Sequence, residues 1–291
     1  MIPEEIQDTL ASLFPAIHSG SKIISTRPLS GGCINHVHQL VTTSGTFCIK
    51  YNLREAFPGM FESESLGLST LERADEIAVP GVIITGASSR YSFIVLEYIS
   101  SSRPIAGFME DFGHSLARLH RHSADYFGFE ADNYMGALPQ VNHKHSEWVS
   151  FFREERLEKQ VQIALAKGYL NEHDSGCFSR LYSRLPDLLC MEPPSLLHGD
   201  LWNGNYMVSA TGKACLIDPA VYYGHREIDL AMTTLFGGFG PGFYSAYQEE
   251  FPLENGWQER FGIYNLYPLL IHLNLFGTSY LGSIREIIRR F

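Results

Sequence analysis

Apolar residues recur at helical spacing near the start of this chain. Ile6, Leu10, Leu13 and Ile17 lie three or four residues apart, which is the period of one face of an α-helix. They predict an amphipathic helix over residues 3–17 that packs against the rest of the fold. This segment is acidic and lacks the basic start and apolar core of a secretory signal peptide.

From residue 22 the pattern alternates with a period of two, which is typical of β-strands. The alternating segments are KIISTRPL, INHVHQLVTT and TFCIKY and, after a helical stretch over residues 60–74, VIITGAS and YSFIVLEYI. They predict a five-stranded antiparallel sheet with one inserted helix. The Ser-rich stretch SSSRP that follows is a composition break of the kind that links two parts of a chain.

The second part of the chain has mainly helical spacing. Amphipathic segments cover residues 108–119, 146–169 and 175–191. The whole pattern therefore predicts an α+β protein with two lobes, in which a small antiparallel β-sheet lobe precedes a larger, mainly helical lobe. We place the boundary between the lobes at residues 99 and 100, so the first lobe comprises residues 1–99 and the second comprises residues 100–291.

Composition restricts the class of partner. The 22 basic and 32 acidic residues give a formal net charge of −10, which argues against nucleic acid or an anionic membrane as the main partner. The five cysteines are scattered and form no C-x-x-C pair, a pattern that fits reduced thiols. No apolar run approaches the length of a membrane span. We expect a cytoplasmic protein that is a monomer or a homodimer.

The chemistry is concentrated in SLLHGDLWNGNYMVSATGKACLID, residues 195–218. Asp200 follows His198 by two positions and precedes Asn205 by five, and Asp218 ends an apolar run, which is the spacing of a kinase catalytic loop with its metal-binding aspartate. Phosphoryl transfer needs one carboxylate to orient the acceptor hydroxyl and other ligands to hold Mg²⁺ on the phosphates. Asp200 suits the first role, and Asn205 with Asp218 suits the second. A Gly-containing turn between two apolar runs predicts a hairpin that returns Asp218 towards Asn205.

Three features of the first lobe fit nucleotide binding, so we assign ATP binding to residues 1–99 and catalysis with substrate binding to residues 100–291. The pair Gly31 and Gly32 lies between two predicted strands, where it makes either an ordinary hairpin turn or a close backbone approach to a phosphate. Lys50 ends the third predicted strand, the position from which a kinase lysine reaches the α- and β-phosphates. Glu64, rather than Glu62, shares a helical stripe with leucines four and seven positions on. We therefore expect Glu64 to pair with the lysine.

Two further segments admit more than one interpretation. The turn-rich stretch FGFEADNYMGALPQVNHKHSEW is either a surface connection or a lip of the substrate site. The histidines in and just before it do not form a zinc-binding pattern. Asp229, eleven positions after Asp218, either caps backbone N–H groups or braces the catalytic loop. The absence of an A-P-E sequence and of a long activation segment argues against a protein kinase.

Several motifs taken together resemble the fructosamine kinase family, which belongs to the aminoglycoside phosphotransferase-like branch of the protein-kinase-like fold. These motifs are GGCIN, FESESLGL, VLEY, FGFEADNYMGALPQVN, HGDLWNGN, LIDPAVYYGHREIDLAM and NLYPLLIHLNLFG. The likeness extends from about residue 20 to the end of the chain. It implies ATP-dependent phosphorylation of ketoamines, the adducts of sugars with amines, on a sugar hydroxyl. The phosphorylated adduct then falls apart and frees the amine, which is called deglycation.

Carried over by position, the resemblance supports Asp200 as the catalytic base and the magnesium and lysine assignments made above. It adds the hinge Glu97-Tyr98-Ile99, whose backbone is implied to bind the adenine of ATP. It also marks Cys33 as a match to a phosphate-loop cysteine linked to redox control in relatives. A small turn residue is an equally good interpretation of Cys33.

Two more residues of the catalytic segment receive roles. Trp202, in the loop beside Asp200, is placed to stack on the sugar, which is a hypothesis of our own. His198, together with Asp229, is assigned to structural support of the loop.

The residues alone are compatible with three functional classes. The first is a kinase for ketoamines, either free or on glycated protein lysines, and the second is a phosphotransferase for an aminoglycoside, choline or another hydroxylated amine. The LPQ-x-N segment and the Leu-Trp pair favour the first. The third class is a pseudokinase, which is expected to lack at least one member of the catalytic set. The chain retains all four: Lys50, Asp200, Asn205 and Asp218.

Overall fold

The computed structural model describes residues 2–17, 22–29 and 34–291. The chain forms two compact units, which are residues 1–108 with 206–218 and residues 109–205 with 219–291. Each unit is described by itself. The assignment of ATP binding to residues 1–99 and of catalysis to residues 100–291 stays a prediction.

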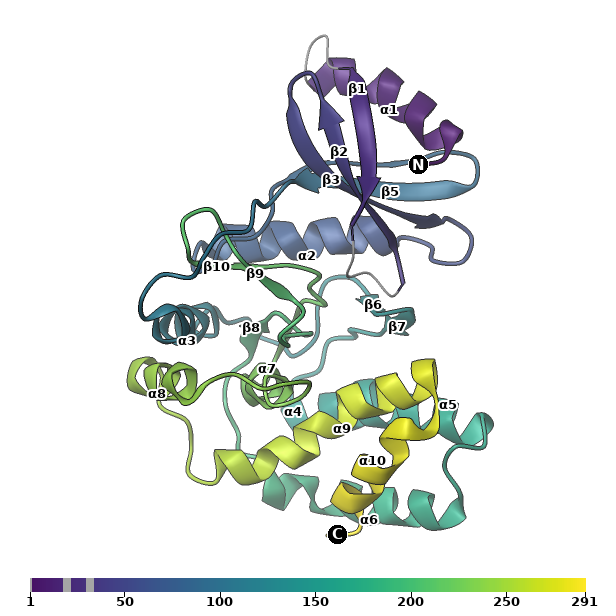
Figure 1. Ribbon diagram of the computed structural model, residues 1–291. Coiled ribbons are helices and arrows are strands. Elements are labelled where there is room, and N and C mark those ends of the chain that lie inside the picture. The colour runs from purple at the N-terminus through teal and green to yellow at the C-terminus, as the bar shows by residue number, and fades with distance from the viewer. Residues whose placement is uncertain (1, 18–21, 30–33) are drawn as a thin grey trace. The chain divides into compact units, whose positions relative to one another are not determined.

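The first unit is built on a five-stranded antiparallel sheet, as the alternation of the sequence predicts (Figure 1). Across the sheet the strands are β1 (Ile23–Pro28), β2 (His36–Thr42), β3 (Gly45–Leu53), β5 (Tyr91–Glu97) and β4 (Val82–Ala87). Strand β3 continues beyond the segment expected from sequence. Lys50 therefore lies inside this strand and pairs across the sheet with Val37 and Ile94.

The two faces of the sheet are covered by different helices (Figure 1). Helix α1 (Glu4–Ile17) packs on one face in a cluster that includes Ile49, and helix α2 (Met60–Ala74) packs on the other in a cluster that includes Ile94. Successive side chains of a strand point to opposite faces, and residues paired across neighbouring strands share a face. Lys50 follows Ile49 and pairs with Ile94, so it projects to the α2 face.

A hairpin from later in the chain also belongs to the first unit. Strands β9 (Tyr206–Val208) and β10 (Ala214–Leu216) pair antiparallel, in the hairpin that the Gly-containing turn predicts. The backbone N–H of Leu216 donates to the carbonyl of Ala78 at 2.8 Å, which attaches the hairpin to this unit. Asp218, two residues beyond the hairpin, consequently belongs to the same unit as the sheet.

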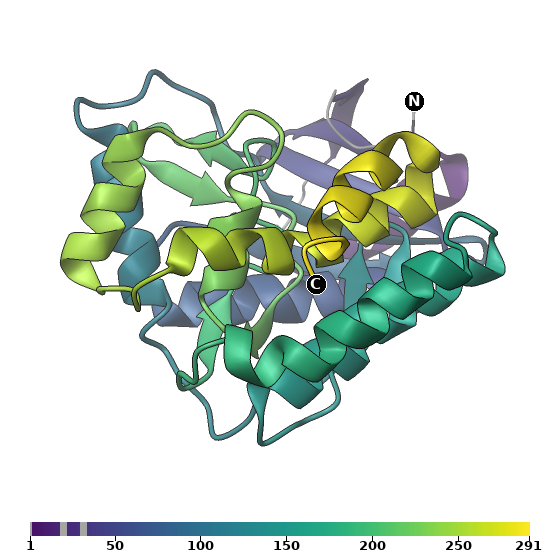
Figure 2. The same ribbon diagram turned by 90° about the horizontal axis from the view of Figure 1, so that it is seen from below.

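The second unit is mainly helical. Its helices are α3 (Phe108–Leu119), α4 (Trp148–Phe151), α5 (Lys159–Ala166), α6 (Glu172–Leu188), α7 (Glu227–Met232), α8 (Pro241–Glu250), α9 (Trp257–Phe276) and α10 (Leu281–Ile288), with a π-helical segment, Phe152–Glu158, between α4 and α5. Helix α9 is buried on several sides, which marks it as the centre of this unit. Figure 2 shows α6 beside the pair formed by α9 and α10.

The second unit also contains two short ladders. Strand β8 (Ser195–Leu197) pairs with β11 (Tyr222–Gly224), and strand β6 (Asn133–Met135) pairs with β7 (Leu138–Gln140). Strand β8 of the first ladder ends directly before His198, where the catalytic loop predicted from the sequence, residues 198–205, begins.

The β6–β7 hairpin corrects one interpretation of the sequence. Its segment was expected to be a surface connection or a lip of the substrate site. The structure buries three of its side-chain amides, since Asn133, Gln140 and Asn142 are 6%, 1% and 2% exposed. A surface connection is therefore wrong for these three residues, whose side chains lie in the interior of the unit, whereas Gly136 and Pro139 of the hairpin are exposed.

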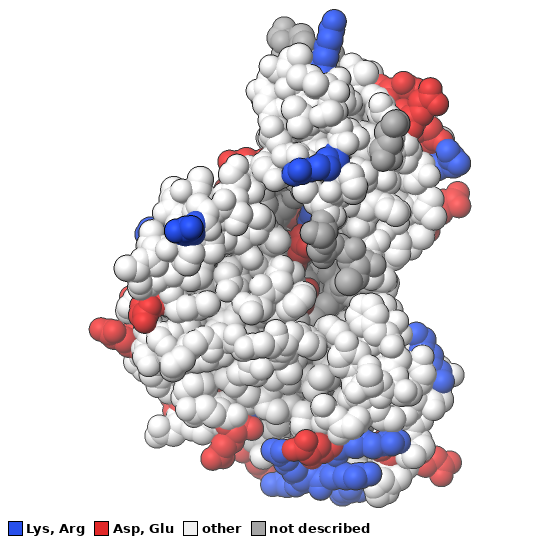
Figure 3. Space-filling model, viewed as in Figure 1, with Lys and Arg blue, Asp and Glu red and all other residues white. Residues whose placement is uncertain are grey.

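The surface charge is uneven despite the acidic composition. Figure 3 shows Lys and Arg side chains gathered over the α6 and α10 region of the second unit. In this region Arg180 donates to the carbonyl of Phe291 at 3.2 Å, and Arg290 pairs with Glu286 at 2.9 Å. Among the described residues, no helix combines the length and apolar character that crossing a membrane requires.

The packing of α3 on α8 generates a stability prediction. A Cβ at Gly113 would collide with the backbone carbonyl of Phe243, so Gly113→Ala forces the helices apart. We expect the free energy of unfolding to fall by about 1–3 kcal/mol, the usual cost of overpacking. Urea denaturation measures it.

Gly262→Ala, in α9, is the matched control, because its Cβ would lie 4.0 Å from Ile287, at ordinary contact distance. This variant is expected to gain about 0.5–1 kcal/mol, since alanine replaces a helical glycine. Equal effects of the two substitutions would contradict the close approach of α3 and α8.

Candidate active site

Lys50 lies between two carboxylates of the first unit. Its Nζ donates to Glu64 Oε1 at 2.5 Å and also to Asp218 Oδ1. The side chains of Lys50 and Glu64 are only 8% and 10% exposed. Burial favours the neutral amine, but the negative charges of Asp218 and Glu64 outweigh it and raise the pKa of Lys50 above its ordinary value. Lys50 is therefore an ammonium at neutral pH, and it can hold a phosphate.

The geometry selects one glutamate of α2. Glu64 reaches Lys50, whereas Glu62 is exposed. Asp218 has a backbone φ of +53°, and its side chain is 43% exposed. A non-glycine residue held in the left-handed region carries strain, and strain of this kind is concentrated at functional sites.

The predicted catalytic loop lies in the second unit, and Asn205 at its end is hydrogen-bonded to Asp200. Asn205 Nδ2 donates to both the carbonyl oxygen and Oδ2 of Asp200, each at 2.9 Å. With its N–H groups directed at Asp200, Asn205 presents its amide oxygen on the opposite side of the amide group. A carbonyl-type oxygen is a ligand that Mg²⁺ accepts, so Asn205 fits the magnesium role expected of it.

A buried carboxylate braces this loop. Asp229, which is fully buried in α7, accepts the backbone N–H of His198 at 2.7 Å with Oδ2 and that of Gly199 at 2.9 Å with Oδ1. The His198 ring is also buried, and its Nδ1 accepts the N–H of Asp200 at 3.3 Å. The sequence left open whether Asp229 caps N–H groups of its own helix or braces the loop. Its hydrogen bonds to His198 and Gly199 show that it contacts the loop.

His120 is a member of this arrangement that sequence reasoning missed. Its Nε2 lies 3.2 Å from Asp229 Oδ2, and its Nδ1 lies 2.8 Å from the hydroxyl of Tyr247. Burial lowers the pKa of His120, against the opposing charge of Asp229. Because a carboxylate only accepts, the neutral ring donates from Nε2 and accepts the Tyr247 hydroxyl at Nδ1. His120 thus fixes Asp229 from the side away from the loop.

Aromatic rings lie beside the loop. Trp202 is half-buried, and its ring meets that of Phe236 edge-on at 5.7 Å. Phe236 in turn lies 4.8 Å from the ring of His272, and it is 39% exposed. An exposed aromatic face of this kind suits the apolar face of a sugar.

The remaining expected site residues are placed as follows. Glu97 ends β5 and donates its backbone N–H to the carbonyl of Gly81 at 2.8 Å, and Tyr98 and Ile99 follow it half-buried. Gly31, Gly32 and Cys33 lie outside the described residues, so their roles stay predictions.

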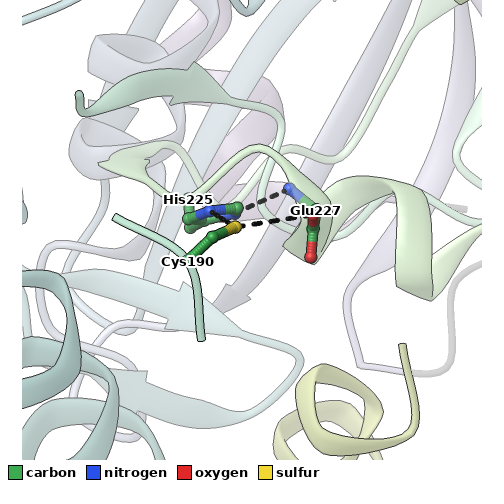
Figure 4. Close-up of side chains that lie close together, drawn as sticks. All are labelled: Cys190, His225 and Glu227. Atoms are coloured by element: carbon green, nitrogen blue, oxygen red, sulfur yellow. Dashed lines mark hydrogen bonds between the residues drawn. The ribbon is translucent and has the colours of Figure 1, made fainter. Parts of the chain in front are cut away.

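A second group of polar atoms lies next to α7 (Figure 4). Cys190 Sγ is 3.3 Å from His225 Nε2 and 3.8 Å from Glu227 Oε1. The backbone N–H of Glu227 donates to His225 Nδ1 at 3.3 Å, so the ring proton lies on Nε2. Arg260 donates to both carboxylate oxygens of Glu227, at 2.6 and 2.8 Å. The proton and the guanidinium occupy the atoms that a metal would need, so this is a hydrogen-bonded cluster that anchors α7.

A sequence model of the family described as fructosamine kinase matches residues 6–291 of this chain. The chain belongs to the fructosamine kinase family. A protein of Enterococcus faecium named a probable ketoamine kinase is 39% identical over 270 residues, which cover 91% of this chain and 94% of that protein. The chloroplastic protein-ribulosamine 3-kinase of Arabidopsis thaliana is 36% identical, over 92% of this chain and 82% of that protein.

Solved structures agree with membership of the fructosamine kinase family. A crystal structure of a candidate fructosamine-3-kinase from Haemophilus somnus superimposes with a TM-score of 0.86 at 31% identity and covers 99% of this chain and 96% of the other. A ternary complex of the aminoglycoside phosphotransferase APH(4)-Ia with AMP-PNP and hygromycin B has a TM-score of 0.65 at 13% identity, with 98% of both chains covered. That second likeness shows the kinase-like fold alone.

The cluster beside α7 generates a prediction about pH. Burial lowers the pKa of His225 to about 4, below the value of about 6.5 for an exposed imidazole. Between these values the unfolded chain binds a proton that the folded protein excludes. We therefore expect the free energy of unfolding to decrease as the pH falls from about 6.5 to 4, with about 3 kcal/mol from this group.

His225→Asn tests this, because Asn Oδ1 can still accept the Glu227 N–H but does not titrate. Urea denaturation at a series of pH values across this interval should show a weaker pH dependence in the variant. Parallel curves for the variant and the unsubstituted protein would contradict the assignment.

Proposed function

We propose that this chain is an ATP-dependent ketoamine kinase that transfers the γ-phosphoryl group of ATP to a sugar hydroxyl of a fructosamine or ribulosamine adduct, which leads to deglycation. The observation that carries the proposal is the set of charged and amide groups in the two units. Lys50 is held between Glu64 and Asp218 in one unit, and Asp200 is held by Asn205 in the other. Membership of the fructosamine kinase family supports the choice of acceptor.

In this proposal the first unit binds the nucleotide. The Lys50 ammonium contacts the α- and β-phosphates, and Glu64 keeps it oriented. The N–H of Glu97 is used inside the sheet, so the adenine is bound by the carbonyl of Glu97 and the backbone of Tyr98 and Ile99. Gly31 and Gly32, which lie outside the described residues, keep the role that the sequence predicts for them, a close backbone approach to a phosphate.

Magnesium is assigned to Asn205 and Asp218. When bound, Mg²⁺ neutralises charge on the transferring phosphates. The amide oxygen of Asn205 and the carboxylate of Asp218 supply the oxygen ligands that this ion prefers. The strained backbone of Asp218 is consistent with such a role, because strain persists where function requires it.

Asp200 receives the proton of the acceptor hydroxyl. The two hydrogen bonds from Asn205 fix the Asp200 side chain relative to the loop, and Asp229 fixes the loop backbone before it. The carboxylate is thereby held in a defined place, which is the main protein contribution to phosphoryl transfer.

The acceptor is proposed to stack on the aromatic face that includes Trp202 and Phe236. The Arabidopsis relative is named for ribulosamines, so ribulose adducts belong in the proposal beside fructose adducts. The amine is either a free metabolite or a protein lysine, and the protein acts as a monomer or a homodimer.

The test of the function is ADP release with Mg-ATP and a panel of acceptors. The panel contains ribulose-lysine, fructose-lysine, kanamycin, choline and no acceptor. We expect activity on the two adducts, and a loss of about 10²-fold or more in Asp200→Asn, the usual scale of a general-base effect. ATP affinity should remain, because Asp200 is not placed on the nucleotide. Activity on kanamycin or choline alone would instead assign a phosphotransferase for another hydroxylated amine.

Asp218→Asn tests the metal assignment. Removing a carboxylate ligand should abolish productive Mg-ATP binding, measured as the dependence of turnover on magnesium concentration. Glu62→Gln is the matched control, because it removes an exposed acidic residue of the same unit, and it should leave this dependence unchanged. A normal magnesium dependence in Asp218→Asn would show that the site is assigned wrongly.

A further inference from the structure

The β6–β7 hairpin contributes a buried network of side-chain amides that the proposed mechanism does not use. Gln140 is 1% exposed and has partners on both ends of its amide. Its Nε2 donates to Asn133 Oδ1 at 2.7 Å and to the carbonyl of Ala220 at 3.1 Å, and its Oε1 accepts the hydroxyl of Tyr267 at 2.7 Å. Buried amides cost free energy unless they are paired in this way. A fully paired amide network fixes the positions of its members.

The direction of each hydrogen bond in the network is determined. Asn133 Nδ2 donates to the carbonyl of Val221 at 2.8 Å, beside the bond from Gln140 to Ala220. Backbone carbonyls only accept, so both amide nitrogens must face this segment. The oxygen of Gln140 then points away from it, and Tyr267 must donate. A single arrangement satisfies all of these groups.

Ala220 connects the amide network to the predicted catalytic loop through its contacts with His198 and Gly199. Its N–H donates to the carbonyl of His198 at 2.9 Å. Its carbonyl lies so close to Gly199, which has a φ of +83°, that a Cβ at Gly199 would collide with it. The backbone directly before Asp200 is thus held by Ala220, while Asp229 holds the N–H groups of the same two residues.

The network is anchored on its other side as well. Asn142 Nδ2 donates to Asn133 Oδ1 at 3.2 Å, and Asn142 Oδ1 accepts Arg156 at 2.6 Å. The Arg156 guanidinium is fully buried and lies 4.1 Å from the centre of the Tyr222 ring, at a distance that suits a cation–π contact. The amides are therefore fixed both to the π-helical segment and to the segment that contacts the loop.

We propose that Gln140 is a positioning residue for phosphoryl transfer, which fixes the place of Asp200 through Ala220 and Gly199. This inference rests on the proposed function for its catalytic consequence, and its structural part stands on the hydrogen bonds alone. Loss of the Gln140 donor frees the carbonyl of Ala220 and lets the loop shift. A shift of about 1 Å at a reacting group is enough to cost up to 10²-fold in rate.

The first experiment compares Gln140→Ala with Gln160→Ala. Gln160 is a matched control, because it is a 3% exposed glutamine of the same unit whose Oε1 accepts Asn274 at 3.0 Å. For Gln140→Ala we expect kcat on the adduct to fall by about 10- to 100-fold, with KM for ATP unchanged. Gln160→Ala should lose stability and keep kcat. Assays run at the same interval below each variant's melting temperature remove the contribution of unfolding.

A second readout separates misplacement from general damage. The ratio of phosphorylated product to ADP released should fall in Gln140→Ala. A shifted Asp200 no longer directs the acceptor hydroxyl, while water can still take the γ-phosphoryl group and release ADP with inorganic phosphate. Partial unfolding lowers both quantities together and leaves the ratio unchanged. If Gln140→Ala does not fold, Tyr267→Phe removes only the hydroxyl that orients Gln140, and it should lower the same ratio by a smaller factor.

Hydrogen–deuterium exchange of the free protein tests the positioning without any acceptor. Peptides that contain residues 198–200 and Ala220 should exchange faster in Gln140→Ala and at the normal rate in Gln160→Ala. Unchanged exchange in Gln140→Ala overturns the inference, and so does faster exchange with normal kcat and normal ratio. If the unsubstituted protein is inactive on every acceptor, the proposed function is refuted instead. The exchange experiment then still decides whether Gln140 holds the loop.

Discussion

The second unit depends on pairing the backbone of its catalytic loop inside the protein. Buried N–H and C=O groups need partners, and residues 198–200 cannot find them in a helix or a long sheet. Asp229 supplies the acceptors for two N–H groups, and Ala220 supplies the donor for one carbonyl. A fully buried carboxylate is itself costly unless it is hydrogen-bonded. The requirement therefore extends to His120, which donates to Asp229.

A related electrostatic constraint organises the first unit. The alternation of β3 turns Lys50 to the α2 face, where the ammonium is buried between Glu64 and Asp218. Two carboxylates around one ammonium leave an excess of negative charge, which suits the approach of a divalent cation. Burying an ammonium is tolerated only when it is paired with carboxylates. The two carboxylates that stabilise the Lys50 ammonium therefore also supply the negative charge that the proposed Mg-ATP site needs.

Much of this architecture could be predicted from the sequence because it depends on local period. The two-residue alternation gave the five-stranded sheet, and the apolar stripe of α2 distinguished Glu64 from Glu62. Asp200 and Asn205 lie five positions apart, so one loop brings them together. Other contacts carried no such signal. His120 and Asp229 are 109 residues apart, and nothing in their local sequence connects them. The turn-rich, aromatic segment that contains Gln140 predicts a surface connection or a lip of the substrate site. Gln140 is instead buried, and its amide donates to the carbonyl of Ala220, a residue 80 positions away that no local pattern connects to it.

The central claim is that this member of the fructosamine kinase family moves a phosphoryl group from ATP to a sugar hydroxyl of a ketoamine. Phosphorus NMR of a reaction with Mg-ATP and ribulose-lysine tests it most directly, because the chemical shift and its coupling to sugar protons identify the atom that receives the phosphate. The account predicts a new phosphomonoester on a sugar hydroxyl, formed together with ADP and formed about 10²-fold or more slowly with Asp200→Asn. A spectrum in which ATP yields only ADP and inorganic phosphate would contradict it.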